Sequence, residues 1–452
     1  MAAAPTGSPP RRPGRDRLAD VHVPFVYAAL GFGVFGGFTL AVSLSIEAAI
    51  AGVSVSWATH AQVHGQLQVI GFAGLFVAGV AAKLIPRFGN GQVPNMRAMT
   101  AAYWCLVVGL LGRAIGQPLL DYPGFAAVML AGALLQLIGA LCFAGATIAV
   151  MGSTARAGAP HAVQISAGAI WLVVQAALGL IWLGGLAGEG GTILRSDHDG
   201  LLVTMALFGF LLSVFSGVGL RAFPTLFGMP APSRRLGLAG AALLQVGLVV
   251  WIGASLGGAE RLAVLGQSSV GAGVLVLVSS FGWWRRETRF AAASEPLSWA
   301  LRGALLSLTL TGALLLVSGL DAAVRDHAVS ARAADAARHV FAVGVITLGI
   351  VGMAQMILPE FASERLVRRP SRRRGPVFAA LLVLAVVSRG IVPLMPVTDG
   401  VRFTSMAIGG TLALVAVAAF GVLFIRARRA HLEYLRRLAG WRGESLPVVE
   451  EP

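Results

Sequence analysis

The sequence predicts an all-α integral membrane protein of about twelve transmembrane helices, arranged as three pseudo-repeated four-helix units. Three observations lead to this prediction. Apolar stretches long enough to cross a bilayer recur from end to end, only 12% of the 452 residues are charged, and one segment recurs three times. A soluble protein of ordinary composition carries about 25% charged residues. No gap between the apolar stretches is long enough for a soluble domain.

Each apolar stretch is long enough to cross a hydrocarbon core about 30 Å thick as a helix. Helices are expected because backbone groups in lipid must be satisfied within the segment. The predicted spans are residues 22–50, 63–86, 97–116, 124–152, 162–186, 199–223, 235–258, 261–284, 297–319, 338–360, 375–396 and 402–426.

These spans form one predicted membrane domain, residues 22–430. Its units cover about 22–152, 162–284 and 297–426. Residues 1–21 are rich in Pro, Gly and Arg and are expected to be disordered. Residues 431–452 are expected to form a second tail. The first apolar stretch is too long for the core of a signal peptide, so we expect it to be retained as a span.

The formal net charge of +15 raises the question of nucleic-acid binding, but the positions of the charges indicate membrane topology instead. Of the 35 Lys and Arg residues, 27 fall in the two tails and the even-numbered connections, and six in the odd-numbered ones. The positive-inside rule then places both termini in the cytoplasm, with the chain in the plasma (inner) membrane. We expect membrane lipids as partners, including anionic lipids, and no nucleic acid.

A repeated segment supports the division into three units. Three stretches begin with histidine, run through a Gly-rich apolar helix and end in proline: residues 64–88, 198–228 and 339–361. Their prolines, Pro86, Pro224 and Pro359, lie 138 and 135 residues apart, which leaves room for four spans in each period. Shared Gly/Leu/Val/Ala composition is the alternative explanation. Repeats in membrane proteins usually place the functional site where the units meet.

Four of the eight histidines lie near the outer ends of the repeated helices: His60, His64, His198 and His339. His64 lies 22 residues before its proline and His339 lies 20 before its own, so each is about 30 Å above it. Imidazole is a common ligand of haem iron and copper. We therefore predict His64 and His339 as metal ligands. His60 and His198 are secondary candidates, and the alternative is that such histidines bind water at the interface.

The other four histidines, His22, His161, His327 and His431, are expected in tails or loops. Two arginines lie within predicted spans, at about the level of the candidate ligands: Arg113 and Arg389. Arginine keeps its charge, and its planar guanidinium can donate two parallel hydrogen bonds to a carboxylate. We predict that both bind a cofactor's acidic groups, with Glu47 as another partner and snorkelling to the headgroups as the alternative.

Twelve helices with histidines near the outer ends of the second, sixth and tenth resemble the architecture of haem–copper oxidase subunit I. The closer resemblance is to the NnrS family, polytopic membrane proteins that contain haem and copper and are tied to nitric oxide and nitrosative stress. A motif of that family is matched by His64, Gly71, Phe72 and Pro86, and a later one by His339 and Gly344.

The sequence also departs from these families. The second histidine and the glutamate of the NnrS motif fall on Gln66 and Leu67, and its later Gly-His-Thr-Gly-Arg segment is absent. The seventh span has no His-His pair, and the tenth has no His-x-His. The resemblance implies a haem- or copper-binding multi-pass membrane protein in the nitric-oxide response, without oxygen-reducing activity.

Two other functions are compatible with the sequence. A twelve-helix secondary transporter is one, since Gly-rich helices and buried arginines suit an anion site, although transporters more often show two repeats of five or six spans. A degenerate oxidase-like subunit with an assembly role is the other. The sequence leaves open the metal or haem type, any turnover and the physiological partner.

Overall fold

The computed structural model describes residues 20–89, 91–283, 295–358 and 374–442, and within them it contains helices and no strands. Twelve helices are long and apolar enough to cross a membrane, which confirms the predicted fold class. Most of the predicted N-terminal tail and Pro359 lie outside the described residues. The spans are His22–Ala51, Val55–Phe88, Met96–Gly116, Phe125–Arg156, Pro160–Glu189, Ser196–Phe227, Arg234–Leu256, Glu260–Phe281, Leu297–Arg325, Ala331–Ile357, Arg374–Leu394 and Asp399–Trp441.

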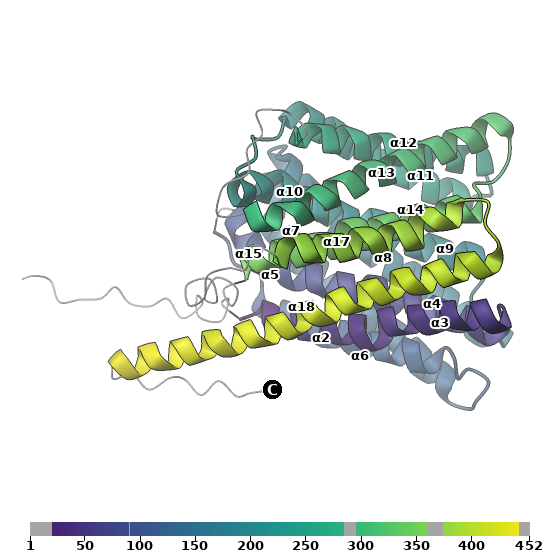
Figure 1. Cartoon of the computed structure of the whole chain (residues 1–452), viewed down its shortest axis with the longest axis horizontal. Coiled ribbons are helices and arrows are strands. Elements are labelled where there is room, and N and C mark those ends of the chain that lie inside the picture. Colours follow the sequence, from purple (N-terminus) through teal and green to yellow (C-terminus); the bar gives the residue numbers. More distant parts are fainter. Residues whose placement is uncertain (1–19, 90, 284–294, 359–373, 443–452) are drawn as a thin grey trace, which may run out of the picture.

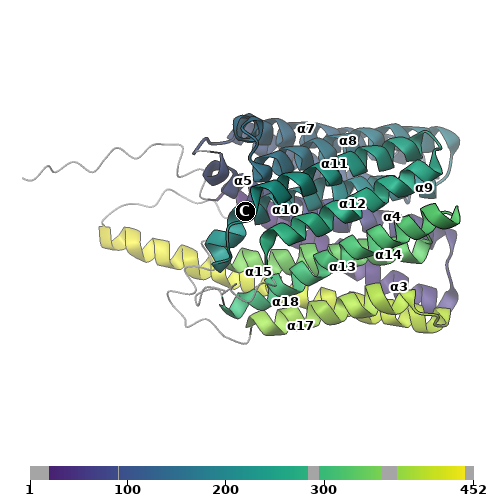
Figure 2. The same ribbon diagram turned by 90° about the horizontal axis from the view of Figure 1, so that it is seen from above.

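The spans run side by side in one bundle (Figures 1 and 2). At one end, here called the histidine end, lie the helices α4 (Val55–Gln66), α9 (Ser196–Thr204) and α14 (Ala331–His339). At the opposite, tail end, α18 (Asp399–Arg442) leaves the bundle. Spans that follow one another in sequence also pack together, as α6 (Met96–Gly116) and α7 (Phe125–Arg156) do. The last span packs along α3 (Thr39–Ala51) of the first.

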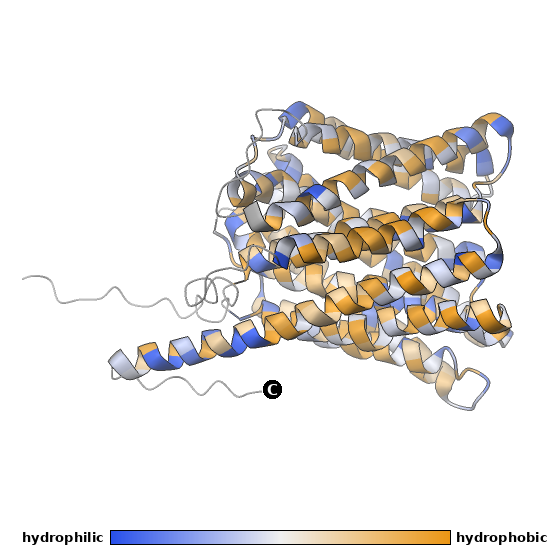
Figure 3. Cartoon of the chain, viewed as in Figure 1, coloured by the Kyte–Doolittle hydropathy of each residue, from blue (hydrophilic) through white to orange (hydrophobic). Residues whose placement is uncertain are grey.

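The second, sixth and tenth spans form the centre of the bundle. Their most apolar windows are 78%, 94% and 89% buried, whereas those of the other nine spans are only 33–56% buried. The outer helices expose large apolar side chains such as Phe35, Ile50 and Val324, and the flanks of the bundle are largely apolar in Figure 3. An apolar outer surface is what a hydrocarbon environment requires. The helices that carry the candidate histidines are therefore the most protected from lipid.

All three central spans contain a π-helical segment, a rare element that is frequent at functional sites. These segments connect α4 to α5 (Leu75–Phe88), α9 to α10 (Leu212–Phe227) and α14 to α15 (Leu348–Ile357). Each begins 19 residues before the proline of its repeat. This common offset is what a triplicated unit would produce, while the unit boundaries stay a prediction. The segments are η2 (Leu67–Gly74), η3 (Met205–Leu211) and η4 (Val340–Thr347).

Serine caps start two of the helices that carry the candidate site. The Ser54 hydroxyl accepts a hydrogen bond from the Trp57 amide at 3.0 Å, and Ser330 accepts one from Ala333 at 3.2 Å. Each such cap stabilises a helix by about 1 kcal/mol. The second and tenth helices consequently begin at residues 55 and 331, earlier than the predicted 63 and 338. Their polar first turns lower the hydropathy and so concealed these starts.

The last helix is longer than predicted. The predicted span ended at residue 426 and the tail began at 431, but α18 continues as one helix to Arg442. Its 44 residues correspond to about 66 Å at roughly 1.5 Å per residue. The final turns project from the tail end and are rich in polar residues (Figures 1 and 3). Arg428 donates a hydrogen bond to Asp20 at 3.0 Å, which ties this helix to the start of the chain.

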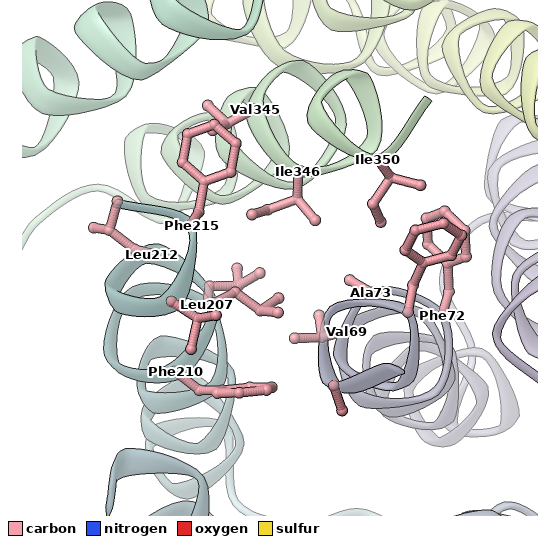
Figure 4. Packing of buried hydrophobic residues seen from close by; sticks show 14 of the residues in the cluster. Val69, Phe72, Ala73, Leu207, Phe210, Leu212, Phe215, Val345, Ile346 and Ile350 are labelled. Atoms are coloured by element: carbon pink, nitrogen blue, oxygen red, sulfur yellow. The ribbon is translucent and has the colours of Figure 1, made fainter. Parts of the chain in front are cut away.

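The middle of the bundle is apolar. Figure 4 shows side chains of the three central spans, among them Val69, Leu207 and Ile346, pointing toward one another. Toward the tail end the same spans surround a small cavity of about 60 Å³. All its lining residues are apolar, including Phe215 and Ile350. This cavity therefore offers no polar side chain to a ligand.

Candidate functional site

A second cavity, of about 230 Å³, lies toward the histidine end and is here called the histidine cavity. Its lining comes from the first, second, sixth, tenth, eleventh and twelfth spans. His64 and His339 both line it, so the structure brings the two main ligand candidates to one space. The lining also includes four charged residues: Asp199, Asp335, Arg338 and Arg389.

The His64 ring is held by a backbone carbonyl of the first span. Its Nδ1 lies 2.9 Å from the oxygen of Gly37, in the π-helix η1 (Phe32–Phe38). A carbonyl can only accept, so Nδ1 carries the hydrogen and Nε2 keeps the lone pair. Gly37 also lets the first and second spans pack closely, because a Cβ there would collide with the side-chain amide of Gln68. In the described part of the chain, His64 makes no other hydrogen bond.

The His339 ring is held in the same tautomer. Its Nδ1 lies 2.9 Å from the backbone oxygen of Asp335 and 3.1 Å from the carboxylate Oδ1 of the same residue. Asp335 in turn accepts two hydrogen bonds from Arg389, at 2.6 Å from Nη1 and 3.2 Å from Nη2. Arg389 belongs to the π-helix η5 (Val387–Ile391). Both candidate ligands thus have a fixed Nδ1–H, and neither Nε2 has a hydrogen-bond partner among the described residues.

The two secondary histidines are not part of this cavity. The Nδ1 of His60 donates to the Ser56 carbonyl at 2.7 Å, within its own helix. The ring of His198 stacks on Trp182, with centroids 4.4 Å apart and planes 2° apart. Both side chains are half-buried, and both lie outside the lining of this cavity.

Three of the histidines expected in tails or loops lie in helices instead. His22 begins α2 (His22–Gly31) and is fully buried, His161 lies in the first turn of α8 (Pro160–Glu189), and His431 lies in α18. The helices of His161 and His431 extend beyond their predicted spans, whereas the first span begins at His22, as predicted.

Arg113 is buried, but it is not part of the cavity lining. Its Nη1 donates to Gln66 Oε1 at 2.9 Å and its Nε to Gln117 Oε1 at 3.2 Å. Gln66 donates onward to Gln136, so the arginine belongs to a network of amides. Glu47, its other predicted partner, accepts instead from Ser54 at 3.4 Å. The structure thus separates Arg113 from Arg389.

Sequence reasoning missed several residues of the cavity. Arg338, which was not singled out in the sequence, lies in α14 and lines the cavity, where its Nη2 donates to the Gly200 carbonyl at 3.2 Å. Within the described ranges it has no carboxylate at ion-pair distance. Asp335 was also missed, although its position four residues before His339 places both on one helix face. Gln68 lines the cavity with a buried amide oxygen that has no hydrogen-bond partner among the residues that the structure describes.

The donor set fits haem better than copper. A protein copper site needs several side-chain ligands, and the described residues contain no group of three or more His, Cys, Asp or Glu side chains that could hold a metal ion. A haem iron needs only axial ligands from the protein, and two imidazoles line this cavity. Its volume of about 230 Å³ is below the roughly 300–1,000 Å³ of most small-molecule pockets, so the walls must part around a porphyrin.

Comparison with known proteins supports the fold and leaves the family open. No protein-family model and no curated protein matches the chain. It is similar to a chain in a cryo-EM structure of a heme-copper terminal oxidase dimer, with a TM-score of 0.64 and 13% sequence identity. The match covers 92% of this chain and 84% of that one. The protein therefore shares the membrane fold of a haem–copper oxidase chain, and the resemblance to the NnrS family stays a prediction.

Proposed function

We propose that this chain is a haem-binding membrane protein in which His64 and His339 are the axial ligands of one non-covalently bound haem. One observation carries the proposal. Two imidazoles from different central helices line a single cavity, and a backbone carbonyl fixes the Nδ1–H of each. Both Nε2 atoms are left as neutral ligands, the form in which imidazole binds iron. The likeness to a haem–copper oxidase fold supports the same proposal.

The other cavity residues have roles that follow from their contacts. The carbonyls of Gly37 and Asp335 orient the two rings, as outer partners of metal-ligating histidines generally do. Arg338 keeps donors available for a cofactor's carboxylate, whereas Arg389 is already engaged by Asp335. Apolar residues of the lining, such as Phe38, keep water from the ring. Bound here, a haem would supply a one-electron couple.

Electron transfer is the role that this donor set supports best. If both imidazoles held the haem, its iron would have no position left for oxygen. Copper, predicted alongside haem, has no group of three ligands in the described part of the chain. We therefore infer a redox carrier that lacks the oxygen-reducing centre of an oxidase, in line with the missing His-His and His-x-His motifs.

The role in nitric-oxide handling implied by the NnrS resemblance requires one histidine to leave the iron. Adding nitric oxide to the reduced protein tests this directly, because displacement of a ligand changes the visible spectrum. The alternatives predict different results. A transporter would take up substrate in proteoliposomes without a cofactor, and an oxidase-like assembly subunit would co-purify with other subunits.

The deciding experiment is the absorption spectrum of the detergent-purified protein, expressed with ample haem. We expect a Soret band and about one haem per chain. His64→Ala and His339→Ala should each shift the band and weaken haem retention, since a single imidazole then remains. His60→Ala and His198→Ala are matched controls, because these rings lie outside the cavity lining, and they should keep the wild-type band.

A colourless wild-type protein would end this proposal. So would equal loss of the band in all four variants, since the loss would then reflect general damage rather than ligation. Retention of the full band in His64→Ala would show that this ring is not a ligand.

A further inference from the structure

We propose that Asp335 is a positioning residue that sets the reduction potential of the iron through His339, and that Arg389 opposes it. This inference rests on the proposed haem site and concerns how that site is tuned. It arises from an asymmetry between the two ligands. The His64 Nδ1 meets only a neutral carbonyl, whereas the His339 Nδ1 also meets a carboxylate at 3.1 Å.

The geometry ties three side chains into one unit. The carboxylate Oδ1 of Asp335 accepts from both His339 Nδ1 and Arg389 Nη2, at 3.1 and 3.2 Å. Its Oδ2 accepts from Arg389 Nη1 at 2.6 Å. All three residues line the histidine cavity. The electron density that Asp335 gives to the His339 ring therefore depends on how strongly Arg389 holds the same carboxylate.

The two charges should act on the iron in opposite directions. A carboxylate hydrogen-bonded to a ligand imidazole makes the ring more basic and favours the oxidised iron, which carries the greater positive charge. Asp335 therefore lowers the reduction potential. Arg389 draws charge from the same carboxylate and is itself a nearby cation, so it raises the potential. If the ion pair only stabilised the fold, removing Asp335 and removing Arg389 would not shift the reduction potential in opposite directions.

The test is a redox titration of the purified haem-loaded protein, in which the absorption spectrum reports the fraction of reduced haem. Asp335→Asn should raise the potential and Arg389→Gln should lower it. We expect each substitution to change the equilibrium constant between oxidised and reduced haem by about tenfold, which corresponds to about 59 mV for a one-electron couple. Arg389→Lys keeps the charge and should stay near the wild-type value. The double variant should fall between the two single variants.

Asp197→Asn is the matched control. This exposed aspartate pairs with Arg195 at 2.8 Å and lies outside the cavity lining, so its loss should leave the potential unchanged. If the Asp335 variant does not fold, the contrast between Arg389→Gln and Arg389→Lys still decides the matter. Equal potentials in those two variants, or shifts of the same sign in Asp335→Asn and Arg389→Gln, would overturn the inference. A wild type without haem would instead overturn the proposed function.

Discussion

Gly65 offers a way to fill the histidine cavity without touching either ligand. It lines the cavity beside His64, and a Cβ added there would meet only one heavy atom within 4 Å, Val203 Cγ2 at 3.9 Å. An alanine therefore fits, and in a helix it is favoured over glycine by about 1 kcal/mol. We expect Gly65→Ala to keep its haem and to be slightly more stable to heat.

Gly65→Phe should fold and lose its haem. A cavity of about 150 Å³ is known to bind benzene, so a phenyl ring fits within the 230 Å³ found here. The ring then occupies the space that the porphyrin needs. We expect occupancy below about a tenth of the wild-type value, a weakening of at least about 1.4 kcal/mol. The assay is the ratio of Soret to aromatic absorbance, with thermal stability measured in the same detergent.

Gly185→Phe is the matched control, because Gly185 is exposed on α8 and a Cβ there meets nothing within 4 Å. It should keep a full Soret band. Wild-type occupancy in a folded Gly65→Phe protein would refute the reasoning, since the haem could not then lie in this cavity.

Three further substitutions probe the elements that hold the site. Ser330→Ala removes the cap of α14 and should lower stability by about 1 kcal/mol, seen as reduced haem retention on heating. Arg113→Gln should destabilise the protein, by about 1.5–3 kcal/mol per lost charged hydrogen bond, while leaving the visible spectrum unchanged; a shifted Soret band would contradict its place outside the cavity. Gly37→Ala forces a Cβ against Gln68 and should disturb the carbonyl that holds His64, so the Soret band should shift or weaken, and an unaltered spectrum would argue against that contact.

The fold could be predicted from the sequence because lipid imposes a simple rule on helix length and polarity. All twelve spans follow from hydropathy, and the largest errors occur where polar first turns or a polar last helix extend beyond the apolar window. The shared depth of His64 and His339 could also be predicted, since it follows from their distance to a proline in repeated helices. Both residues do line one cavity.

The hydrogen-bond partners of the site's side chains could not be predicted, because they depend on which helices lie next to one another in the bundle. Arg113 and Arg389 have similar sequence surroundings, yet the first meets Gln66 and the second meets Asp335. The difference arises in three dimensions, from the neighbours of each helix. The π-helical segments add to the difficulty, because they turn the side chains that follow away from the positions of a regular α-helix.

The apolar packing between the three central helices has a consequence for how the protein would respond to the membrane potential. The small cavity toward the tail end is lined only by apolar groups, which offers charge no favourable way through the middle of the bundle. Because the histidine cavity lies toward the histidine end, an electron held there would exchange most readily with partners at that same face. Moving one charge fully across a membrane costs about 2.3 kcal/mol per 100 mV. An electron that is taken up and released at one face does not cross the potential, so this cost does not apply. Such a carrier would run equally well in energised and de-energised membranes.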